Sequence, residues 1–328
     1  MEELVSQKRS ETELFRTENL VVYFKVRGGS KLFVHAVDGV DFTAKPRRST
    51  GIVGESGSGK TTLAKALLGV VKPTSGKVLF EGRDINALKG DALRDFRRRV
   101  QMVYQDPFDA IDPLYSVYDA VAEGLRILRL YSSKEELDER VARALEAVKL
   151  TPWSEYAYRR ITALSGGQRQ RVAVARTLAM DPEVFILDEP VSMLDASVKG
   201  EIIKLMDNLK PNGKSFIMIS HDIATVRFFT DELAVMYLGK IVESGPSGEV
   251  VSEPLHPYTQ ALIAAVPVPD PSVSVRSLAK GEIPSAVAPP SGCRFHPRCP
   301  LAQEICSARE PELREVRPGR FVACHFAS

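Results

Sequence analysis

Apolar positions along the chain follow two periods, one typical of strands and one typical of helices. From residue 20 to residue 52 they alternate as in half-buried strands, with a Gly28-Gly29 turn. This segment ends in the apolar run Gly51-Ile52-Val53. From residue 61 to residue 71 apolar side chains recur every three to four positions, which predicts an amphipathic helix.

The alternation of strands and helices continues through the middle of the chain. Residues 92–149 are dominated by helix formers, broken at Pro107 and Pro113, and Pro152 closes the segment. Strand patterns return at residues 184–187, 215–219 and 233–237. This order of elements predicts an α/β fold, and the strand that ends at residue 53 leads into a glycine-rich loop.

The character of the sequence changes after about residue 250. Residues 254–300 are rich in proline, and all the cysteines lie at the end of this stretch or beyond it. We therefore expect a large α/β domain at residues 1–250, with a helical subdomain at about 106–165. Residues 251–328 are expected to form a C-terminal extension.

Composition and charge exclude several classes of protein. The chain has 328 residues, 44% hydrophobic and 26% charged, so it can bury a sizeable core. A formal net charge of +2 argues against a nucleic-acid binder, because no large positive field is available. No stretch approaches the ~20 apolar residues of a membrane helix, and residues 1–10 lack the apolar core of a secretory signal. These features favour a cytoplasmic protein, whose cysteines would be metal ligands or buried thiols in place of disulfides.

The glycine-rich segment after the first apolar run fits the phosphate-loop pattern G-x-x-x-x-G-K-[ST] without a mismatch. Its residues are Gly54, Glu55, Ser56, Gly57, Ser58, Gly59, Lys60 and Thr61, followed by Thr62. Glycines let successive N–H groups point at phosphate oxygens, and the positive end of the following helix adds to the attraction. Lys60 would contact the β- and γ-phosphates of a nucleotide, and the Thr61 hydroxyl would bind Mg²⁺.

A second site element follows the apolar run at residues 184–187, which predicts a buried strand that ends in Asp188 and Glu189. Asp188 suits the coordination shell of Mg²⁺, and Glu189 is placed to orient or deprotonate an attacking water. A positioned general base typically contributes about 10²–10⁴-fold to a rate. Four consecutive apolar residues argue against a simple surface turn.

Upstream of the acidic strand lies Leu164-Ser165-Gly166-Gly167-Gln168, followed by an apolar helix. In this position, between a phosphate loop and an acidic strand, the segment resembles the signature of the ABC ATPase family. Its serine and glycines would cap a helix and offer donors to an anion. The resemblance implies that the signature loop binds the γ-phosphate held by a partner subunit, in a head-to-tail dimer with ATP and Mg²⁺.

The same resemblance gives roles to further residues. Gln105 resembles the glutamine that senses Mg²⁺ and water and links to membrane subunits, and Asp195 resembles the aspartate at the dimer seam. His221 resembles the switch histidine that contacts the γ-phosphate, and together with Lys60, Glu189 and Gln105 it completes the catalytic set. For the aromatic side chain that stacks on adenine we expect Phe24, with Tyr23 as the alternative. One departure is Lys45-Pro46-Arg47-Arg48, which replaces the Gly-Glu turn of many members.

The four cysteines, Cys293, Cys299, Cys306 and Cys324, have the spacing C-x5-C-x6-C-x17-C. This is neither the paired pattern of a zinc ribbon nor the ferredoxin run. The spacing is compatible with three alternatives: a zinc site, an iron–sulfur cluster, or four thiols without metal. However, His256-Pro257-Tyr258 and the segment 292–300 resemble the C-terminal extension of oligopeptide and dipeptide importer ATPases. This resemblance implies a structural [4Fe–4S] cluster, with zinc as the alternative, and it leaves His296 and His325 as neighbouring or surface residues.

The resemblance also implies partners. Residues 168–171 and 190–192 resemble the second of the two ATPases that such importers carry, so a related, non-identical ATPase is the expected partner. Two membrane permease subunits and, indirectly, an extracytoplasmic substrate-binding protein would complete a peptide importer, with this chain peripheral on the cytoplasmic face of the membrane. The same motor could serve an oligosaccharide or nickel importer. A soluble ABC ATPase outside transport and a redox-sensing module are alternatives of another class.

Overall fold

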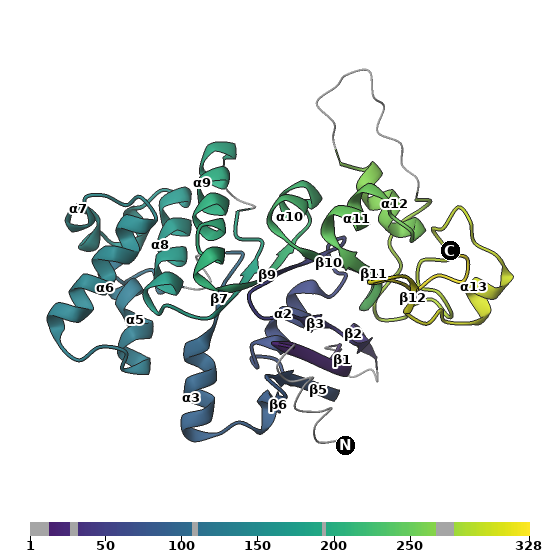
Figure 1. Cartoon of the computed structure of the whole chain (residues 1–328), viewed down its shortest axis with the longest axis horizontal. Helices are drawn as coiled ribbons and strands as arrows, with labels where there is room; N and C mark the ends of the chain where they lie inside the picture. The colour runs from purple at the N-terminus through teal and green to yellow at the C-terminus, as the bar shows by residue number, and fades with distance from the viewer. Residues whose placement is uncertain (1–12, 27–31, 107–110, 192–194, 267–278) are drawn as a thin grey trace. The chain divides into compact units, whose positions relative to one another are not determined.

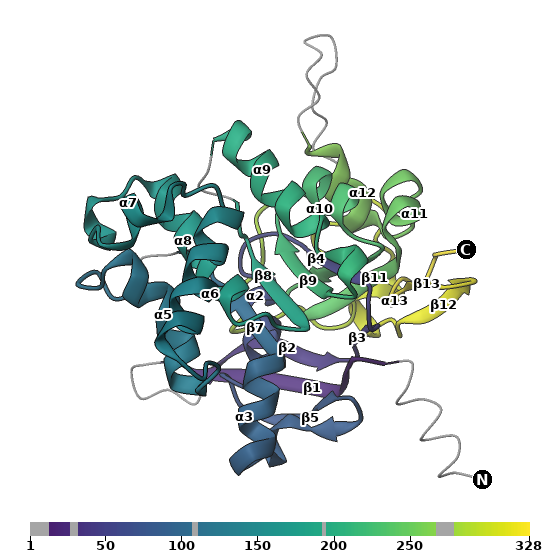
Figure 2. The ribbon, with the colours of Figure 1, turned by 60° about the vertical axis from the view of Figure 1, so that its left-hand side comes forward.

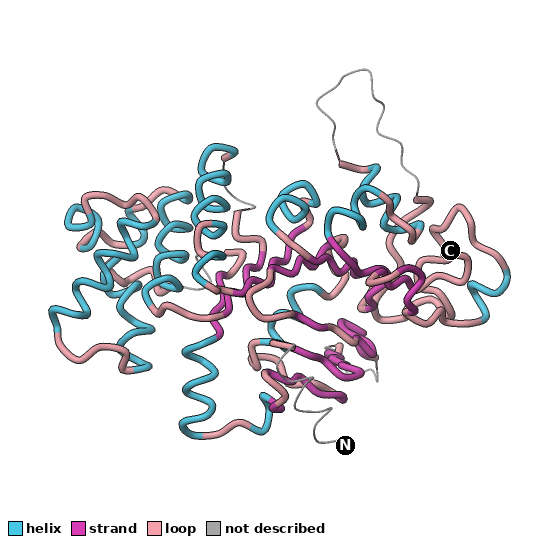
Figure 3. Tube along the Cα trace, in the orientation of Figure 1, coloured by secondary structure: helices cyan, strands magenta, loops and turns pink. Residues whose placement is uncertain are grey.

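The structure is a computed structural model that describes residues 13–26, 32–106, 111–191, 195–266 and 279–328. By compactness the chain divides into two units. The first consists of Met1–Ala87 together with Met218–Ser328, and the second is Leu88–Ile217. Strands gather in the first unit, whereas helices predominate in the second (Figure 3). Each unit is described separately.

An antiparallel sheet forms the N-terminal part of the first unit. Its strand order is β2-β1-β5-β6, with β3 paired to β1. The strands are β1 (Phe15–Lys25), β2 (Phe33–Val40), β3 (Thr43–Ala44), β5 (Ser75–Phe80) and β6 (Arg83–Asp84). Alternate side chains of β1 are buried, as the sequence pattern predicts for a sheet with one covered face.

The second sheet segment of this unit has the order β12-β13-β11-β10-β4. It contains β4 (Ser49–Val53), β10 (Glu232–Tyr237), β11 (Lys240–Pro246), β12 (Arg314–Arg317) and β13 (Arg320–Val322). β4 and β10 are parallel, and all five residues of β4 are buried. Because β13 pairs with β11, the C-terminal extension adds two strands to the edge of this sheet.

Short helices pack beside these strands. They are α2 (Lys60–Leu67), α10 (Ile223–Phe229), α11 (Ser247–Ser252), α12 (Pro257–Ala264), α13 (Glu304–Ala308) and the 3₁₀ turn η1 (Ile85–Ala87). Helices α10, α11 and α12 lie next to one another in both views of the ribbon (Figures 1 and 2). β9 (Ser215–Ser220) spans the division between the units.

The second unit contains a parallel pair of strands together with helices. The strands are β7 (Val100–Val103) and β8 (Val184–Asp188). The helices are α3 (Gly90–Arg99), α5 (Val117–Leu128), α6 (Lys134–Ala147), α7 (Trp153–Ala157), α8 (Gly166–Ala179) and α9 (Ala196–Asp207), with 3₁₀ turns η2 (Ile161–Ala163) and η3 (Lys210–Asn212). Helices α3 and α8 contact β7, the first of the two strands. Helix α8 packs against α5 and α6, and its buried side chains are mainly valine and alanine.

The predicted α/β class and the strands expected at residues 184–187, 215–219 and 233–237 are confirmed as β8, β9 and β10. The expected Gly28-Gly29 turn and the break at Pro107 lie outside the described residues. Compactness groups the C-terminal extension with the first unit, and the domain boundary at residue 250 stays a prediction. No helix in the described ranges is both long enough and apolar enough to cross a membrane.

Candidate nucleotide site and the cysteine cavity

The phosphate-loop segment connects β4 to α2 in the first unit, and two of its glycines are required by close backbone contacts. Gly54 has φ +157° and Gly59 has φ +103°. A Cβ atom would lie 2.2 Å from the Met236 carbonyl oxygen at the first position and 2.0 Å from the Ala36 carbonyl oxygen at the second. Any side chain there would displace backbone, so the loop needs glycine in both places.

Lys60 begins helix α2 and its side chain is 6% exposed. Its Nζ atom donates to the carbonyl oxygens of Gly54 at 2.8 Å and Glu55 at 2.9 Å. No side chain caps the start of α2, because its N-cap is Gly59. The loop therefore combines a buried ammonium group with the positive end of a helix, which is the arrangement that attracts phosphate.

The remaining loop residues differ in exposure. Ser58 is buried, whereas Ser56 and Gly57 are exposed at the tip. Thr61 and Thr62 lie half-buried in the first turn of α2. Their contacts with nucleotide and Mg²⁺ stay predictions.

Of the two aromatic candidates in β1, Phe24 is the one with an exposed ring, at 44%. The Tyr23 ring instead lies 4.1 Å from the His35 ring, and its hydroxyl donates to Asp38 Oδ1 at 2.7 Å. Burial and the bond to Asp38 raise the pKa of Tyr23 to about 12. These contacts hold Tyr23 in place, which favours Phe24 for stacking on adenine.

His221 follows β9 and is exposed. The residue after it, Asp222, caps helix α10 by accepting from Thr225 N at 3.1 Å. The backbone N–H of Asp222 donates to Ser220 Oγ at 3.0 Å. The side chains of Ser220 and Asp222 thus fix the backbone next to His221. A fixed backbone lets the exposed His221 side chain be directed at a ligand.

In the second unit, Asp188 is the last residue of β8 and is 2% exposed. Glu189 follows with φ +46°, a left-handed conformation that non-glycine residues adopt at a cost of order 1–3 kcal/mol. A buried side chain supports this turn, because Gln170 Nε2 of helix α8 donates to the Pro190 carbonyl oxygen at 2.7 Å. Helix α8 and the acidic turn are therefore held together directly.

The signature segment provides the N-terminal cap of α8. Ser165 Oγ accepts from Gln168 N at 3.3 Å, and Gln168 Oε1 accepts from Ser165 N at 3.1 Å, which is a capping box. Ser165 and Gly166 are exposed, Gly167 is half-buried, and a Cβ at Gly166 would meet nothing within 4 Å. The loop presents a capped helix end on the surface of the unit.

Gln105 is exposed two residues beyond the end of β7. Asp195 is the N-cap of α9 and its carboxylate accepts from Val198 N at 3.0 Å. Residues 192–194 lie outside the described residues. The predicted site residues of the second unit are therefore Gln105, residues 165–168, Asp188, Glu189 and Asp195, and their roles in catalysis stay predictions.

All four cysteines line one cavity of about 60 Å³ in the first unit. The pKa of Cys293 is raised to about 11, mainly by burial and to a smaller extent by the neighbouring thiols Cys306, Cys324 and Cys299. Burial also raises the pKa of Cys299. The four thiols are therefore neighbours, yet no three His, Cys, Asp or Glu side chains among the described residues are arranged to hold a metal ion.

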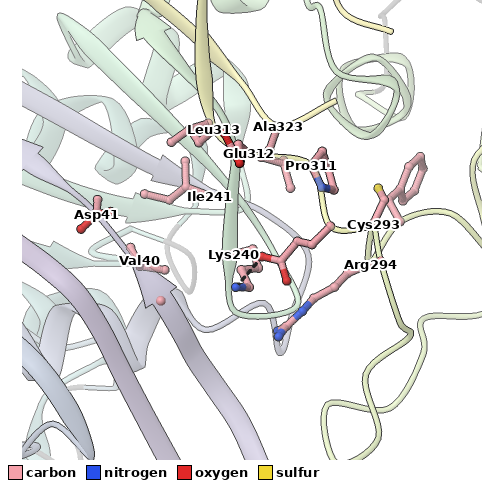
Figure 4. A pocket seen from close by; sticks show the side chains of 15 residues that line it. Val40, Asp41, Lys240, Ile241, Cys293, Arg294, Pro311, Glu312, Leu313 and Ala323 are labelled. Atoms are coloured by element: carbon pink, nitrogen blue, oxygen red, sulfur yellow. Dashed lines mark ion pairs between the residues drawn. The ribbon is translucent and has the colours of Figure 1, made fainter. Parts of the chain in front are cut away.

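A larger cavity of about 400 Å³ lies on another side of Cys293 (Figure 4). It is bordered by β2, β11 and the extension, and Lys240 Nζ pairs with Glu310 across it at 2.7 Å. Next to Cys293, Arg294 is buried and pairs with Asp38 and with the Leu238 carbonyl oxygen. Burial opposes ionisation of Asp38, but hydrogen bonds from Tyr23 and Arg294 outweigh it and lower the pKa of Asp38 to about 2.

Sequence reasoning missed two side chains of the extension that contact the phosphate loop. Tyr258 Oη accepts from Glu55 N at 2.8 Å, and Arg298 Nη1 donates to Glu55 Oε2 at 2.7 Å. Both residues belong to segments that carry the family resemblance, but nothing in the local pattern indicates a contact across 243 positions of the chain.

Comparison with known proteins identifies two family regions. Residues 37–192 match the family model described as "ABC transporter", and residues 242–306 match "Oligopeptide/dipeptide transporter, C-terminal region". The second match covers Cys293 and Cys299 and ends at Cys306.

Curated relatives match nearly the whole chain. The putative oligopeptide transport ATP-binding protein YkfD of Bacillus subtilis is 42% identical, over 95% of this chain and 95% of its own length. The oligopeptide transport ATP-binding protein AppF of the same organism is 44% identical, over 93% of this chain and 95% of its own length.

Solved structures share the fold. The dimeric ATP-binding cassette MJ0796, in a post-hydrolysis state with ADP and Pi, aligns with a TM-score of 0.65 at 28% identity, over 71% of this chain and 98% of its own. The cbiO1 protein of Clostridium perfringens aligns with a TM-score of 0.62 at 31% identity, over 74% of this chain and 92% of its own.

Proposed function

This chain belongs to the ABC transporter ATP-binding family and hydrolyses ATP, and on that premise we propose that it powers a peptide importer. The observation that carries the proposal is the match of residues 242–306 to the C-terminal region of oligopeptide and dipeptide transporters, in a chain that is 42% identical to a relative named for oligopeptide transport. These relatives favour peptide over the oligosaccharide and nickel alternatives, and they favour transport over a soluble ATPase or a redox sensor.

The proposed chemistry begins at the phosphate loop. Lys60 exchanges its bonds to the loop carbonyls for bonds to the β- and γ-phosphates, and the start of α2 adds its N–H donors. Phe24 stacks on adenine. Thr61, Gln105 and Asp188 are the residues that would supply oxygen atoms to Mg²⁺, and the ion would neutralise phosphate charge.

Hydrolysis then depends on Glu189 and His221. Glu189 orients and deprotonates the attacking water, and its left-handed backbone, with Gln170 supporting the next residue, holds it at the end of β8. His221 contacts the γ-phosphate. The capped and exposed signature loop, Ser165 to Gln168, is free to serve a nucleotide on a second ATPase subunit, with Asp195 at the seam.

We propose a non-identical ATPase as that second subunit, two membrane permeases as further partners and a substrate-binding protein as an indirect one. The chain would then sit peripherally on the cytoplasmic face of the membrane. Expression with and without a candidate partner ATPase, using Glu189→Gln to slow hydrolysis, tests this assembly. We expect ATP-Mg²⁺ to stabilise a dimer of the variant with the partner, measured by size-exclusion chromatography with light scattering.

Each outcome decides a different part of the proposal. A dimer of the variant with itself would replace the heterodimer by a homodimer. Failure of every form to bind ATP-Mg²⁺ would overturn the proposed roles of the phosphate loop. In steady state we expect Glu189→Gln to reduce kcat by at least about 10²-fold with ATP binding retained, because the general base is lost and the loop is untouched.

We also propose that Cys293, Cys299, Cys306 and Cys324 hold a [4Fe–4S] cluster. The support is that four thiols line one cavity, and thiolates are the ligands that such clusters use. Among the described residues no three of these thiols are arranged to hold a metal ion, so cluster binding would require the thiols to rearrange. The cluster would join the four cysteines by metal–thiolate bonds and so stabilise the fold of the extension.

Anaerobic purification followed by iron, sulfide and zinc analysis tests this proposal. Iron and acid-labile sulfide near four of each per chain, lost together in Cys306→Ser, are the expected result. One zinc per chain without sulfide would assign the alternative metal, and absence of both in active protein would overturn a metal role for these cysteines.

A further inference from the structure

Besides a backbone bond from Ser58 N to its carbonyl oxygen at 3.2 Å, three side chains hold Glu55, the second residue of the phosphate loop. Its backbone N–H donates to Tyr258 Oη at 2.8 Å, and its carbonyl oxygen accepts from Lys60 Nζ at 2.9 Å. Its carboxylate accepts from both terminal nitrogens of Arg298, at 2.7 Å and 3.1 Å. Two of these three contacts come from the C-terminal extension, so the start of the loop is fixed from outside the ATPase core.

The Arg298 side chain is itself preorganised. It is buried, and its guanidinium carbon lies 5.8 Å from the centres of both the Tyr237 and Phe295 rings. Nη1 also donates to Tyr237 Oη at 3.4 Å. A planar guanidinium that lies near two buried rings and binds a carboxylate by two bonds is held in one orientation, so Arg298 defines where the Glu55 carboxylate lies.

The rings around Arg298 form one cluster with Tyr258. The Tyr237 and Tyr258 ring centres are 4.6 Å apart, and the Phe295 ring is 5.3 Å from Tyr237 and 5.4 Å from Tyr258. All three rings are at most 1% exposed. The two groups that hold Glu55 therefore share a rigid support, and they would move together.

The backbone of Arg298 belongs to the cysteine-bearing turn. Arg298 N donates to the Phe295 carbonyl oxygen at 2.9 Å, and Cys299 N, in the next residue, donates to the His296 carbonyl oxygen at 3.3 Å. Cys293 N donates to the Cys306 carbonyl oxygen at 2.7 Å, which joins this turn to the rest of the extension. The position of the Arg298 guanidinium thus depends on the fold of the turn that carries two cysteines.

Fold stability alone does not explain the Arg298–Glu55 pair, because buried ion pairs contribute little to the free energy of unfolding compared with apolar packing. Among its described residues the extension carries two other buried arginines, Arg294, which pairs with Asp38, and Arg320, which pairs with Glu243. Of the three, Arg298 is the one whose carboxylate partner lies in the phosphate loop. The geometry points to a specific effect on the nucleotide.

We propose that Arg298 is a positioning residue for the phosphate loop, through which the C-terminal extension sets the affinity for ATP-Mg²⁺. By holding Glu55, it keeps the first turn of the loop in the conformation that directs its N–H groups at phosphate. Without it, nucleotide binding must order the loop first, and that ordering lowers the affinity. This role concerns ATP binding and does not depend on which substrate is transported.

The test compares Arg298→Gln with the wild-type full-length chain in equilibrium binding of a fluorescent ATP analogue with Mg²⁺. We expect the Kd to rise about tenfold, which corresponds to about 1.4 kcal/mol. At saturating ATP we expect kcat of the partnered enzyme to change less than about twofold, because Arg298 contacts no reacting atom. Arg298→Lys, which keeps the charge and loses the planar fork, is expected to give an intermediate Kd.

Two controls separate positioning from general stability. Arg320→Gln breaks a more deeply buried pair, between the extension and Glu243 of β11, so we expect it to lower Tm and leave the Kd of the folded protein unchanged. Glu55→Gln breaks the Arg298 pair from the loop side and should raise the Kd as Arg298→Gln does, with the double variant no worse than either. Glu55→Gln also serves as the test if Arg298→Gln does not fold, since the Glu55 side chain is 28% exposed.

Reciprocity gives a second readout. If the extension favours ATP binding through Arg298, bound ATP must stabilise the extension by the same free energy. We expect ATP-Mg²⁺ to slow amide hydrogen exchange at residues 293–299 in the wild type, and not in Arg298→Gln. A wild-type Kd in both Arg298→Gln and Glu55→Gln, with equal exchange protection, would overturn the proposal and leave the pair a packing contact.

Discussion

The protonation state of His256, a residue of the extension, is determined by its burial. The side chain is 1% exposed and its Nδ1 atom accepts from Tyr258 N at 3.0 Å, which caps helix α12. Burial lowers the pKa of His256 from 6.5 to about 3, against a smaller opposing effect from a backbone hydrogen bond at Ala323. The neutral imidazole is therefore part of the folded structure.

This depressed pKa predicts acid sensitivity of the fold. Between pH 6.5 and about 3, His256 is protonated in the unfolded chain and neutral in the folded chain. The free energy of unfolding therefore falls as pH falls. The contribution is fully present above pH 6.5, and by pH 5 about 2 kcal/mol is lost. Urea denaturation at pH 7.5 and pH 5 measures it. His256→Asn keeps an N-cap acceptor without a titrating group, so its loss over the same interval should be smaller by that amount, and an unchanged loss would refute the assignment.

At the residue scale, sequence patterns predicted the phosphate loop and the acidic strand end because each is encoded by adjacent residues. The Arg298 contact with Glu55 could not be predicted, since the two residues are 243 positions apart and neither belongs to a pattern for pairing. The clustered cysteines predicted a shared metal site. The four thiols do line one cavity, but ligand geometry depends on side-chain rotamers that spacing does not determine.

At the element scale, helix α8 combines a structural cap with the predicted contact to ATP. The Ser165 hydroxyl accepts from Gln168 N, and the same side chain is predicted to face a nucleotide on the partner subunit. Helix α6 of the same unit has a comparable cap, in which Ser133 accepts from Glu136 N at 3.3 Å. The two serines therefore allow the two roles to be separated.

We expect Ser165→Ala and Ser133→Ala to destabilise the protein by similar amounts, about 1 kcal/mol each, because each removes one N-cap. Only Ser165→Ala should also weaken ATP-dependent dimerisation, measured in the Glu189→Gln background. Equal dimerisation in both variants would remove Ser165 from the predicted nucleotide contact and leave it a capping residue.

The strand β7 shows where the pattern of apolar residues fails. It lies inside the segment 92–149 that reads as helical, and has only four residues, Val100 to Val103. A strand this short lacks a measurable two-residue period, and the helix α3 before it ends without a glycine or proline. Its pairing with β8 defines it as a strand, and that pairing joins residues more than eighty positions apart.

At the scale of the whole molecule, the extension is tied to the core by buried charge. Arg320 on β13 pairs with Glu243 on β11 at 2.6 Å, and the two side chains are 1% and 0% exposed. The Glu243 carboxylate also accepts from Leu255 N and His256 N, so it organises the start of α12. The edge of the sheet and the first helix of the extension share this carboxylate.

We expect Arg320→Gln to lower the free energy of unfolding by about 3–5 kcal/mol, because Glu243 remains buried without its counter-ion. Adding Glu243→Gln should recover part of this loss, since the uncompensated charge is removed. Chemical denaturation of the two single variants and the double variant measures the coupling. Strictly additive losses would show that the pair does not act as a unit.

The division of the chain also affects its synthesis. The first unit is split, with its second part beginning at residue 218. The N-terminal sheet of β1, β2, β3, β5 and β6 is complete when residue 87 has been made. In contrast, the backbone N–H of Ser49, at the start of β4, donates to the carboxylate of Asp231, which is synthesised 182 residues later.

At about 5–20 residues per second, a ribosome needs roughly ten to forty seconds to supply that partner. During this time β4, whose five residues are all buried in the finished protein, has no β10 with which to pair. An apolar strand exposed on a nascent chain is a site for chaperone binding and for aggregation. Slowing translation between residues 54 and 231 should therefore lower the yield of soluble protein more than slowing it after residue 246.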